Sequence, residues 1–193
     1  MDNRELILKT AVSLFSARGY DAVGVQEIVE QAGVTKPTLY YYFGSKQGLL
    51  QEIVDTNGII LEQMLSDAAA VPGDVPSALK RVARAYFDFA NGHWEFYRLL
   101  VGQLHAGHET EGFRTVFPVI RRCYQFLVKL FDDSADMLGN MNGRQAQFAI
   151  SFLGTLDSHM VMFMLNPDEK EHAHVTDEKV HEIVRQFLYG IFS

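Results

Sequence analysis

The sequence predicts an all-α protein of about nine helices. Apolar residues recur at helical spacing along almost the whole chain of 193 residues, and the sustained alternation that marks strands is hard to find. Glycines, prolines and capping residues interrupt this periodicity at intervals that suit helix ends. With 48% hydrophobic and 21% charged residues, the composition is that of a soluble globular protein with a substantial core.

The N-terminal part is expected to hold four helices. The first and second each end at a glycine, and the third and fourth each follow a hydroxyl residue that can cap a helix. In order, these signals are Gly19, a helix at about 25–32 followed by Gly33, Thr35 before a helix that stops near Gly44, and Ser45 before a longer fourth helix.

Five further helices are expected beyond residues 71–76, a stretch with two prolines and a glycine that is typical of a loop. Their ranges are about 77–91, 94–105, 112–131, 143–165 and 177–192, with a polar segment at 166–176 before the last.

Cysteine content and hydropathy argue against a disulfide-stabilised protein and against a membrane-spanning one. The single Cys123 cannot form an intrachain disulfide, which favours a reducing compartment, and we expect it to pack among apolar neighbours. No apolar run approaches the roughly 18 residues needed to cross a bilayer. Because Asp2, Arg4 and Glu5 break up any signal-peptide core, the expected location is the cytoplasm, with no membrane partner.

The net charge of −7 is unevenly placed. Residues 1–50 carry five basic and five acidic side chains, which leaves 12 basic and 19 acidic side chains for residues 51–193. A neutral N-terminal part joined to an acidic remainder suggests two functional parts. The overall charge therefore does not exclude DNA binding by the first part.

Residues 25–43 have the pattern of two short helices joined by a tight turn at Gly33. Leu39 and Phe43 are four residues apart and anchor the second of these helices inward. The outer face then carries hydroxyls and phenols with a lysine near each end, which suits the major groove of DNA. This face comprises Lys36, Pro37, Thr38 and Tyr41, with Tyr40 and Tyr42 on its flanks and Lys46 just beyond it. The alternative is an ordinary helical hairpin with a solvated tyrosine face.

The same segment resembles the N-terminal domain of the TetR (tetracycline-repressor-like) transcriptional regulators. The resemblance covers about residues 4–54 and is carried by Gly19-Tyr20-Asp21-Ala22, by Ile28 and by the run AGVTKPTLYYYFGSKQGLL at 32–50. It departs from the usual family pattern at Gly24, Val29 and Tyr42.

The resemblance implies a helix-turn-helix DNA-binding domain at 1–46 and a helical effector-binding and dimerisation domain at 47–193. It further implies a homodimer that represses transcription from a palindromic double-stranded DNA operator until a small-molecule effector binds. By family role, the groove contacts are Thr35, Lys36, Pro37, Thr38 and Tyr41, and the phosphate contacts are Tyr40, Tyr42 and Lys46.

Aromatic side chains concentrate in the second part, where residues 86–131 hold 11 of the chain's 23 aromatics. As a group they favour an apolar cavity for a hydrophobic or aromatic effector, whereas each one alone is typical of a packed core. Gln103 could add an orienting polar contact. The candidate ligand-binding residues are Tyr86, Phe89, Trp94, Tyr97, Phe117, Tyr124, Phe152, His159 and Met160.

The last helix has more apolar surface than one core face requires. Small residues four apart in the helix at 143–165 would let another helix approach closely, which is compatible with a four-helix dimer interface. The resemblance implies this interface, and packing within one chain is the alternative. The candidate interface residues are Ile150, Gly154, Ser158, Val161, Val184, Phe187 and Ile191.

Enzyme and metal chemistry find little support in the sequence. The pairs His105 with His108 and His172 with His174 have no third ligand at convincing spacing, so neither a metal nor another cofactor is expected. There is also no nucleophile–base motif or phosphate-binding glycine loop, and we expect no enzyme. The remaining alternative to a regulator is a DNA-independent small-molecule carrier or interaction protein.

Overall fold

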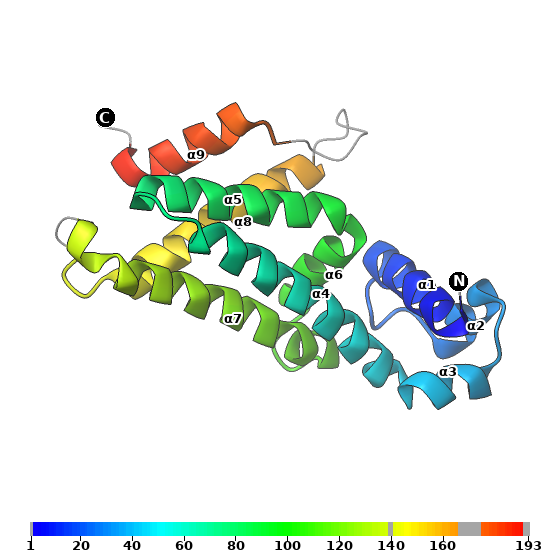
Figure 1. The fold of residues 1–193 in the computed structure, drawn as a ribbon. Coiled ribbons are helices and arrows are strands. Elements are labelled where there is room, and N and C mark those ends of the chain that lie inside the picture. The colour runs from blue at the N-terminus through cyan, green and yellow to red at the C-terminus, as the bar shows by residue number, and fades with distance from the viewer. Residues whose placement is uncertain (1, 139–140, 166–174, 191–193) are drawn as a thin grey trace. The chain divides into compact units, whose positions relative to one another are not determined.

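The computed structural model describes residues 2–138, 141–165 and 175–190, and these residues form helices joined by turns and loops (Figure 1). The expected all-α class is confirmed in this described part of the chain. The helices are α1 (Asn3–Arg18), α2 (Val25–Ala32), α3 (Lys36–Phe43), α4 (Lys46–Ala70), α5 (Val75–Gly92), α6 (Trp94–Leu104), α7 (Glu111–Asp133), α8 (Gln145–Leu165) and α9 (Asp177–Tyr189), with a short 3₁₀ turn, η1 (Ala135–Met137).

The chain forms two compact units. Unit 1 comprises Met1–Ile59 and His93–Ile120, and unit 2 comprises Ile60–Gly92 and Arg121–Ser193. Helices α4 and α7 therefore each contribute one part to unit 1 and one part to unit 2. The expected functional division at residue 46 stays a prediction.

In unit 1, α1 packs against α2 and α6 through fully buried apolar side chains. Ile7, Ala11 and Phe15 lie on one face of α1, as their spacing of three to four residues requires, and all are at most 1% exposed. The phenol of Tyr20, just after α1, donates a hydrogen bond to Glu111 at the start of α7. This bond and the burial of Tyr20 fix the position of the loop that leads into α2.

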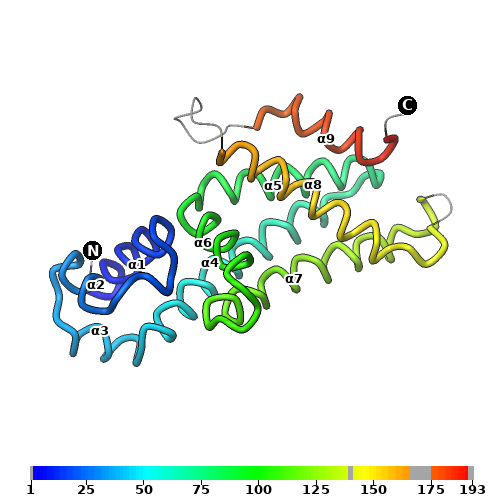
Figure 2. The backbone as a smooth tube through the Cα atoms, turned by 180° about the vertical axis from the view of Figure 1, so that it is seen from behind, coloured from blue at the N-terminus to red at the C-terminus, as the bar shows by residue number. Residues whose placement is uncertain are grey.

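In unit 2, α9 lies along α5 and α8, as Figures 1 and 2 show from opposite sides. Phe131 of α7, Phe148 and Phe152 of α8 and Phe187 of α9 meet there in what we call the aromatic cluster. The rings of Phe152 and Phe187 are the closest pair, with centroids 4.9 Å apart. Phe152 is fully buried, so the cluster forms part of the core of this unit.

Helix α8 is more apolar than the sequence analysis implied. It has 21 residues and a mean hydropathy of 1.5 over its best 18-residue window, so by length and composition alone it could cross a membrane. This corrects the expectation that no segment reaches that length, because scattered polar residues interrupt the run without lowering its average far. Only 28% of the window is buried, and a single such helix is weak evidence for a membrane span.

Candidate nucleic-acid interface and effector region

The turn between α2 and α3 depends on Gly33. Its φ of 64° and ψ of 30° are left-handed values, which glycine adopts without the steric cost that a Cβ would add. The N–H of Val34 then donates to the carbonyl of Val29 over 3.0 Å, which closes the end of α2. The glycine-centred turn expected from the sequence is present.

The start of α3 is organised by two threonines and a proline. The Thr35 hydroxyl accepts a hydrogen bond from the backbone N–H of Thr38, and the two threonine hydroxyls lie 2.9 Å apart. Pro37 lies in the first turn, where its missing N–H costs no helical hydrogen bond. Because a hydroxyl can both donate and accept, this pair retains capacity for an outside partner.

The inner and outer faces of α3 follow the expected arrangement. Leu39 is fully buried, whereas Tyr41 is 83% exposed and Tyr40 and Tyr42 are 46% and 40% exposed. The rings of Tyr41 and Tyr42 contact each other edge to face, with centroids 5.1 Å apart. Lys36 and Pro37 are also exposed. We call Lys36, Pro37, Thr38 and the three tyrosines the outer face of α3.

Lys46 lies in a different environment from Lys36. Its side chain is half-buried, and its Nζ donates to the carbonyls of Tyr20 at 3.0 Å and Val23 at 3.1 Å. The same ammonium lies 4.1 Å from the centroid of the Tyr20 ring, within the range of a cation–π contact. Lys46 therefore joins the start of α4 to the loop between α1 and α2. Sequence spacing gave no signal for this role.

Arg4 and Arg18 of α1 also contact the helices of the N-terminal part. Arg4 pairs with Glu52 of α4, and its guanidinium carbon lies 5.9 Å from the centroid of the Phe43 ring. Arg18 pairs with Glu27 of α2. These side chains are partly exposed, so each ion pair adds little stability by itself. They nevertheless connect α1 to α2, α3 and α4.

Residues 7–53 match the family model described as "Bacterial regulatory proteins, tetR family". This part of the chain is therefore similar to the N-terminal domain of the tetR family. The matched range contains the helix–turn–helix and its outer face, and it ends in α4.

Two curated relatives match part of the chain. The HTH-type transcriptional activator FasR of Mycolicibacterium smegmatis is 33% identical over 51% of this chain and 45% of its own length. The HTH-type transcriptional repressor BdcR of Escherichia coli is 40% identical over 42% of this chain and 44% of its own. The chain thus spans less than half the length of these two HTH-type regulators, one named an activator and the other a repressor.

Solved structures resemble the whole fold at lower identity. The fatty acid degradation regulator FadR of Bacillus halodurans has a TM-score of 0.80 at 20% identity and covers 99% of this chain and 97% of its own. FadR of Bacillus subtilis, solved in complex with stearoyl-CoA, has a TM-score of 0.78 at 19% identity. The match covers 97% of this chain and 98% of that FadR chain. AibR, solved in complex with isovaleryl coenzyme A and operator DNA, has a TM-score of 0.72 at 22% identity. The match covers 98% of this chain and 99% of the AibR chain. At this identity the likeness shows the shared fold alone.

The predicted effector residues divide between the two units. Trp94, Tyr97 and Phe117 belong to unit 1, and the others, Tyr86, Phe89, Tyr124, Phe152, His159 and Met160, belong to unit 2. In unit 1, Tyr97 is buried, whereas Phe117 is 43% exposed and stacks on Phe113 with centroids 5.2 Å apart. Phe117 therefore lies at a surface of its unit.

Within unit 2, several of the predicted residues are packed into the core. Phe152 and Met160 are fully buried, and Phe89 is 1% exposed. The Tyr86 phenol donates a hydrogen bond to Asp157 of α8. Burial lowers the pKa of His159, and the positive charge of Lys179 lowers it further, so the neutral imidazole is favoured. Whether these side chains contact an effector stays a prediction.

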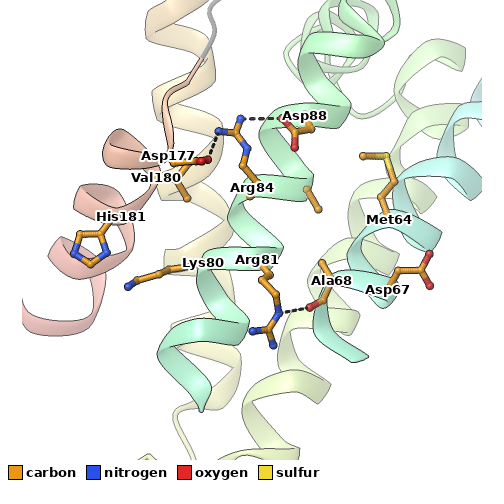
Figure 3. Close-up of a pocket in the computed structure, with 11 residues that line it drawn as sticks. Met64, Asp67, Ala68, Lys80, Arg81, Arg84, Asp88, Asp177, Val180 and His181 are labelled. Atoms are coloured by element: carbon orange, nitrogen blue, oxygen red, sulfur yellow. Dashed lines mark hydrogen bonds and ion pairs between the residues drawn. The ribbon is translucent and has the colours of Figure 1, made fainter. Parts of the chain in front are cut away.

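A groove that the sequence did not reveal lies among α4, α5 and α9 of unit 2 (Figure 3). Its volume is about 670 Å³, within the usual range for small-molecule sites. Apolar and charged side chains both line it. They are Met64, Asp67 and Ala68 of α4, Lys80, Arg81, Arg84, Ala85 and Asp88 of α5, and Asp177, Val180 and His181 of α9.

The predicted dimer residues lie in two kinds of environment. Ile150, Gly154 and Ser158 are exposed on α8, with Ile150 at 62%. A shallow concavity of about 560 Å³ lies beside them, lined by Ser151, Gly154, Thr155, Ser158, His159 and Met162. Val161 is half-buried, Val184 is fully buried and Phe187 belongs to the aromatic cluster. Ile191 lies outside the described residues. The exposed apolar surface is therefore on α8 rather than on the buried side of α9.

The residues considered for metal or redox chemistry are placed as follows. Among the described residues, no group of three or more His, Cys, Asp or Glu side chains has the arrangement of a metal site, and His172 and His174 lie outside them. The Nδ1 of His105 lies 2.9 Å from the carbonyl of Val101, and His108 is exposed. Cys123 is 3% exposed, and burial raises the pKa of its thiol to about 12, which keeps it protonated at neutral pH.

Proposed function

We propose that this protein is a homodimeric DNA-binding transcriptional regulator of the cytoplasm. It acts as a repressor that a small hydrophobic effector releases from a palindromic operator. The observation that carries the proposal is the outer face of α3, where Tyr41 is 83% exposed on a short helix anchored by the fully buried Leu39. A large exposed aromatic face on a TetR-family helix–turn–helix is suited to a DNA groove.

At the operator, α3 enters the major groove. Thr35, Lys36, Pro37, Thr38 and Tyr41 reach the groove, and Tyr40 and Tyr42 contact the flanking phosphates. Lys46 has one remaining N–H that can reach a phosphate, since two carbonyls already accept from its ammonium. Residues 1–46 are the DNA-binding domain and 47–193 the effector-binding and dimerisation domain.

Two copies of the chain associate through α8. Ile150, Met162 and Leu165 are 62%, 65% and 70% exposed, an unusual amount of apolar surface for one helix of a globular protein. Gly154 and Ser158 provide small side chains where a second helix can approach. A symmetric dimer would present two α3 helices to successive major grooves, roughly 34–36 Å apart.

The effector belongs to the acyl thioesters of coenzyme A. This class is supported by the two structural relatives that were solved with stearoyl-CoA and isovaleryl coenzyme A. Such molecules join an apolar chain to a charged nucleotide, and unit 2 offers both apolar and basic surfaces. An effector that favours a dimer with the wrong spacing needs a coupling of only about 1–3 kcal/mol to lower operator affinity about 5- to 150-fold.

The DNA-binding part of the proposal is tested by selecting bound fragments from a genomic library with the purified protein at two salt concentrations. We expect one palindrome to be enriched and to survive the higher salt. On that sequence, Tyr41→Ala should weaken binding by roughly 1–3 kcal/mol, as for a lost base contact. Tyr41→Phe separates the contribution of the hydroxyl from that of the ring.

Lys129→Ala is the control for these variants, because Lys129 is an exposed lysine of α7 in unit 2. It should bind the palindrome as the wild-type protein does. Enrichment of no sequence, with weak binding that is lost at higher salt, would contradict the proposal and favour the carrier alternative.

The dimer is tested by Ile150→Glu, measured by analytical ultracentrifugation. A charge on the apolar face of α8 should shift the protein toward monomer at micromolar concentration, because burying it unpaired is costly. Met137→Glu is the matched control, since Met137 is 65% exposed and lies in η1, outside α8. If both variants sediment as the wild-type protein does, α8 is not the interface.

A further inference from the structure

We propose that the groove among α4, α5 and α9 binds the phosphorylated nucleotide part of the effector. The inference rests on the proposed function, because it takes the effector to be a coenzyme A thioester. It adds the place on this chain where the phosphates and the base would bind.

The basic side chains of the groove all come from α5, where Lys80 extends toward α9 and Arg81 toward Ala68 of α4 (Figure 3). Lys80 and Arg84 are four residues apart and therefore neighbours on one face of α5, whereas Arg81 lines the side of the groove toward α4. Lys80 is half-buried, and no ion pair or hydrogen bond of its ammonium is found among the described residues. Holding an unpaired ammonium partly away from water is unfavourable unless an anion is available to it.

Arg84 also has hydrogen-bonding capacity left. Its guanidinium pairs with Asp88 at 2.9 Å and Asp177 at 3.3 Å, and it donates to the carbonyl of Val175. Its Nε is buried and has no acceptor within the described part of the chain. A phosphate oxygen would supply that acceptor, and arginine and lysine together are typical ligands of phosphate esters.

The three carboxylates of the groove are engaged to different degrees. Asp88 and Asp177 are both paired with Arg84, and Asp67 accepts a hydrogen bond from the Gln63 amide at 2.8 Å. The three carboxylates equal Lys80, Arg81 and Arg84 in formal charge. However, Asp88 and Asp177 both pair with the guanidinium of Arg84. Lys80 and Arg81 make no ion pair within the described part of the chain, and the nearby carboxylate of Asp74, just before α5, offsets part of their charge. Arg81 donates to the carbonyls of Ala68 and Val71, which are neutral.

The rest of the groove can hold the base. Met64 and Ala68 of α4, Ala85 of α5 and Val180 of α9 give apolar walls beside the cations. A volume of about 670 Å³ is enough for a nucleotide. This pattern, apolar walls with a few basic groups, matches a planar base linked to phosphates better than it matches a fatty acid alone.

The position of the groove also suggests how binding reaches the DNA-binding domain. Helix α4 begins at Lys46, within the matched family domain, and continues to the groove residues Met64, Asp67 and Ala68. A ligand held between α4, α5 and α9 would favour one arrangement of α4 over another. That differential contact is what a population shift requires.

The test measures binding of four probes to the full-length protein by isothermal titration calorimetry. They are coenzyme A, adenosine 3′,5′-bisphosphate, inorganic phosphate and palmitate. We expect the two nucleotides to bind more tightly than either phosphate or palmitate. Lys80→Ala should weaken both nucleotides about tenfold, the effect of one lost charge-assisted hydrogen bond. Lys129→Ala, with the same loss of charge on an exposed part of α7, should leave nucleotide binding unchanged.

A second variant tests the apolar walls without changing charge. Ala85→Leu should fill part of the groove and weaken the nucleotides, while thermal melting checks that both variants remain folded. The inference is overturned if inorganic phosphate binds as tightly as adenosine 3′,5′-bisphosphate, or if Lys80→Ala binds the nucleotides as the wild-type protein does. Tight binding of palmitate without nucleotide binding also overturns it.

The two proposals fail in distinguishable ways. Operator binding is measured on the wild-type protein without any nucleotide. If a palindrome is enriched but coenzyme A does not bind, the groove inference alone is wrong. If no DNA sequence is enriched, the proposed function is wrong whatever the nucleotides do. In the favourable case, palmitoyl-CoA releases the operator from the wild-type protein, and Lys80→Ala needs about tenfold more of it.

Discussion

The outer face of α3 and the aromatic cluster of unit 2 place similar side chains in opposite environments. Tyr41 is 83% exposed and its ring contacts that of Tyr42 on the same helix, whereas Phe152 is fully buried and contacts rings from two other helices. Exposure of a large ring leaves it available for recognition, and burial commits it to packing. The composition of a segment therefore does not decide its role; what covers it does.

The largest effect is expected at the aromatic cluster. Phe152→Ala removes a ring that packs against Phe131 and Phe187, and it should lower the free energy of unfolding by about 3–5 kcal/mol. Denaturant unfolding followed by circular dichroism measures this loss. A core role for Phe152 predicts a stability defect before any change in effector binding.

Phe117→Ala supplies the contrast for that measurement. Phe117 is 43% exposed and stacks on Phe113, so its removal should lower the free energy of unfolding by about 1 kcal/mol or less.

Equal stability of the wild-type protein and Phe152→Ala, together with altered effector affinity, would show that the aromatic cluster lines a cavity. That result would restore the effector role expected from the sequence.

The helix boundaries could be predicted because their signals are local. Gly33 needs a left-handed backbone, Thr35 caps the helix that follows it, and the spacing of Leu39 from its neighbours decides which face of α3 is buried. Each of these depends on residues fewer than ten positions away. The outer face of α3 could therefore be recognised without any tertiary information.

The remaining features depend on contacts between distant parts of the chain. Lys46 bonds to carbonyls 23 and 26 residues before it, and the groove requires α9 to lie beside α5. The apolar pattern of α9 was interpreted as part of a dimer face, with packing inside one chain as the alternative. The structure buries Val184 in the core, where periodicity alone could not place it.

A moderate effect is expected at Lys46, where two interpretations differ. Loss of its hydrogen bonds to Tyr20 and Val23 in Lys46→Ala should lower the free energy of unfolding by about 1–3 kcal/mol, because a charged donor is removed from a half-buried site. A phosphate contact predicts instead that the salt dependence of DNA binding falls by about one unit. Denaturant unfolding and the salt slope, which is the slope of the logarithm of DNA affinity against the logarithm of salt concentration, are both measured on the same variant.

Lys36→Ala is the matched comparison, since Lys36 is exposed at the start of α3. We expect it to lower the salt slope by about 0.9 with little change in stability. If Lys46→Ala melts as the wild-type protein does while its salt slope falls by about one, then the contacts of its ammonium to the loop contribute little. The lysine would then act at DNA alone.

The smallest effect is expected from His159, on α8 between its buried and exposed faces. Burial lowers the pKa of His159 below its ordinary 6.5, with Lys179 lowering it further, so the unfolded chain takes up this proton at a higher pH than the folded one. As pH falls below about 7, the unfolded state is therefore favoured, and stability decreases until the folded imidazole also becomes protonated.

Urea unfolding between pH 8 and pH 5 should show a shallower decrease in stability for His159→Asn than for the wild-type protein. The control His108→Asn, at an exposed site, should follow the wild-type curve. Parallel curves for all three proteins would mean that His159 is solvated in solution, and the side of α8 that carries it would then belong with the exposed surface rather than with the core.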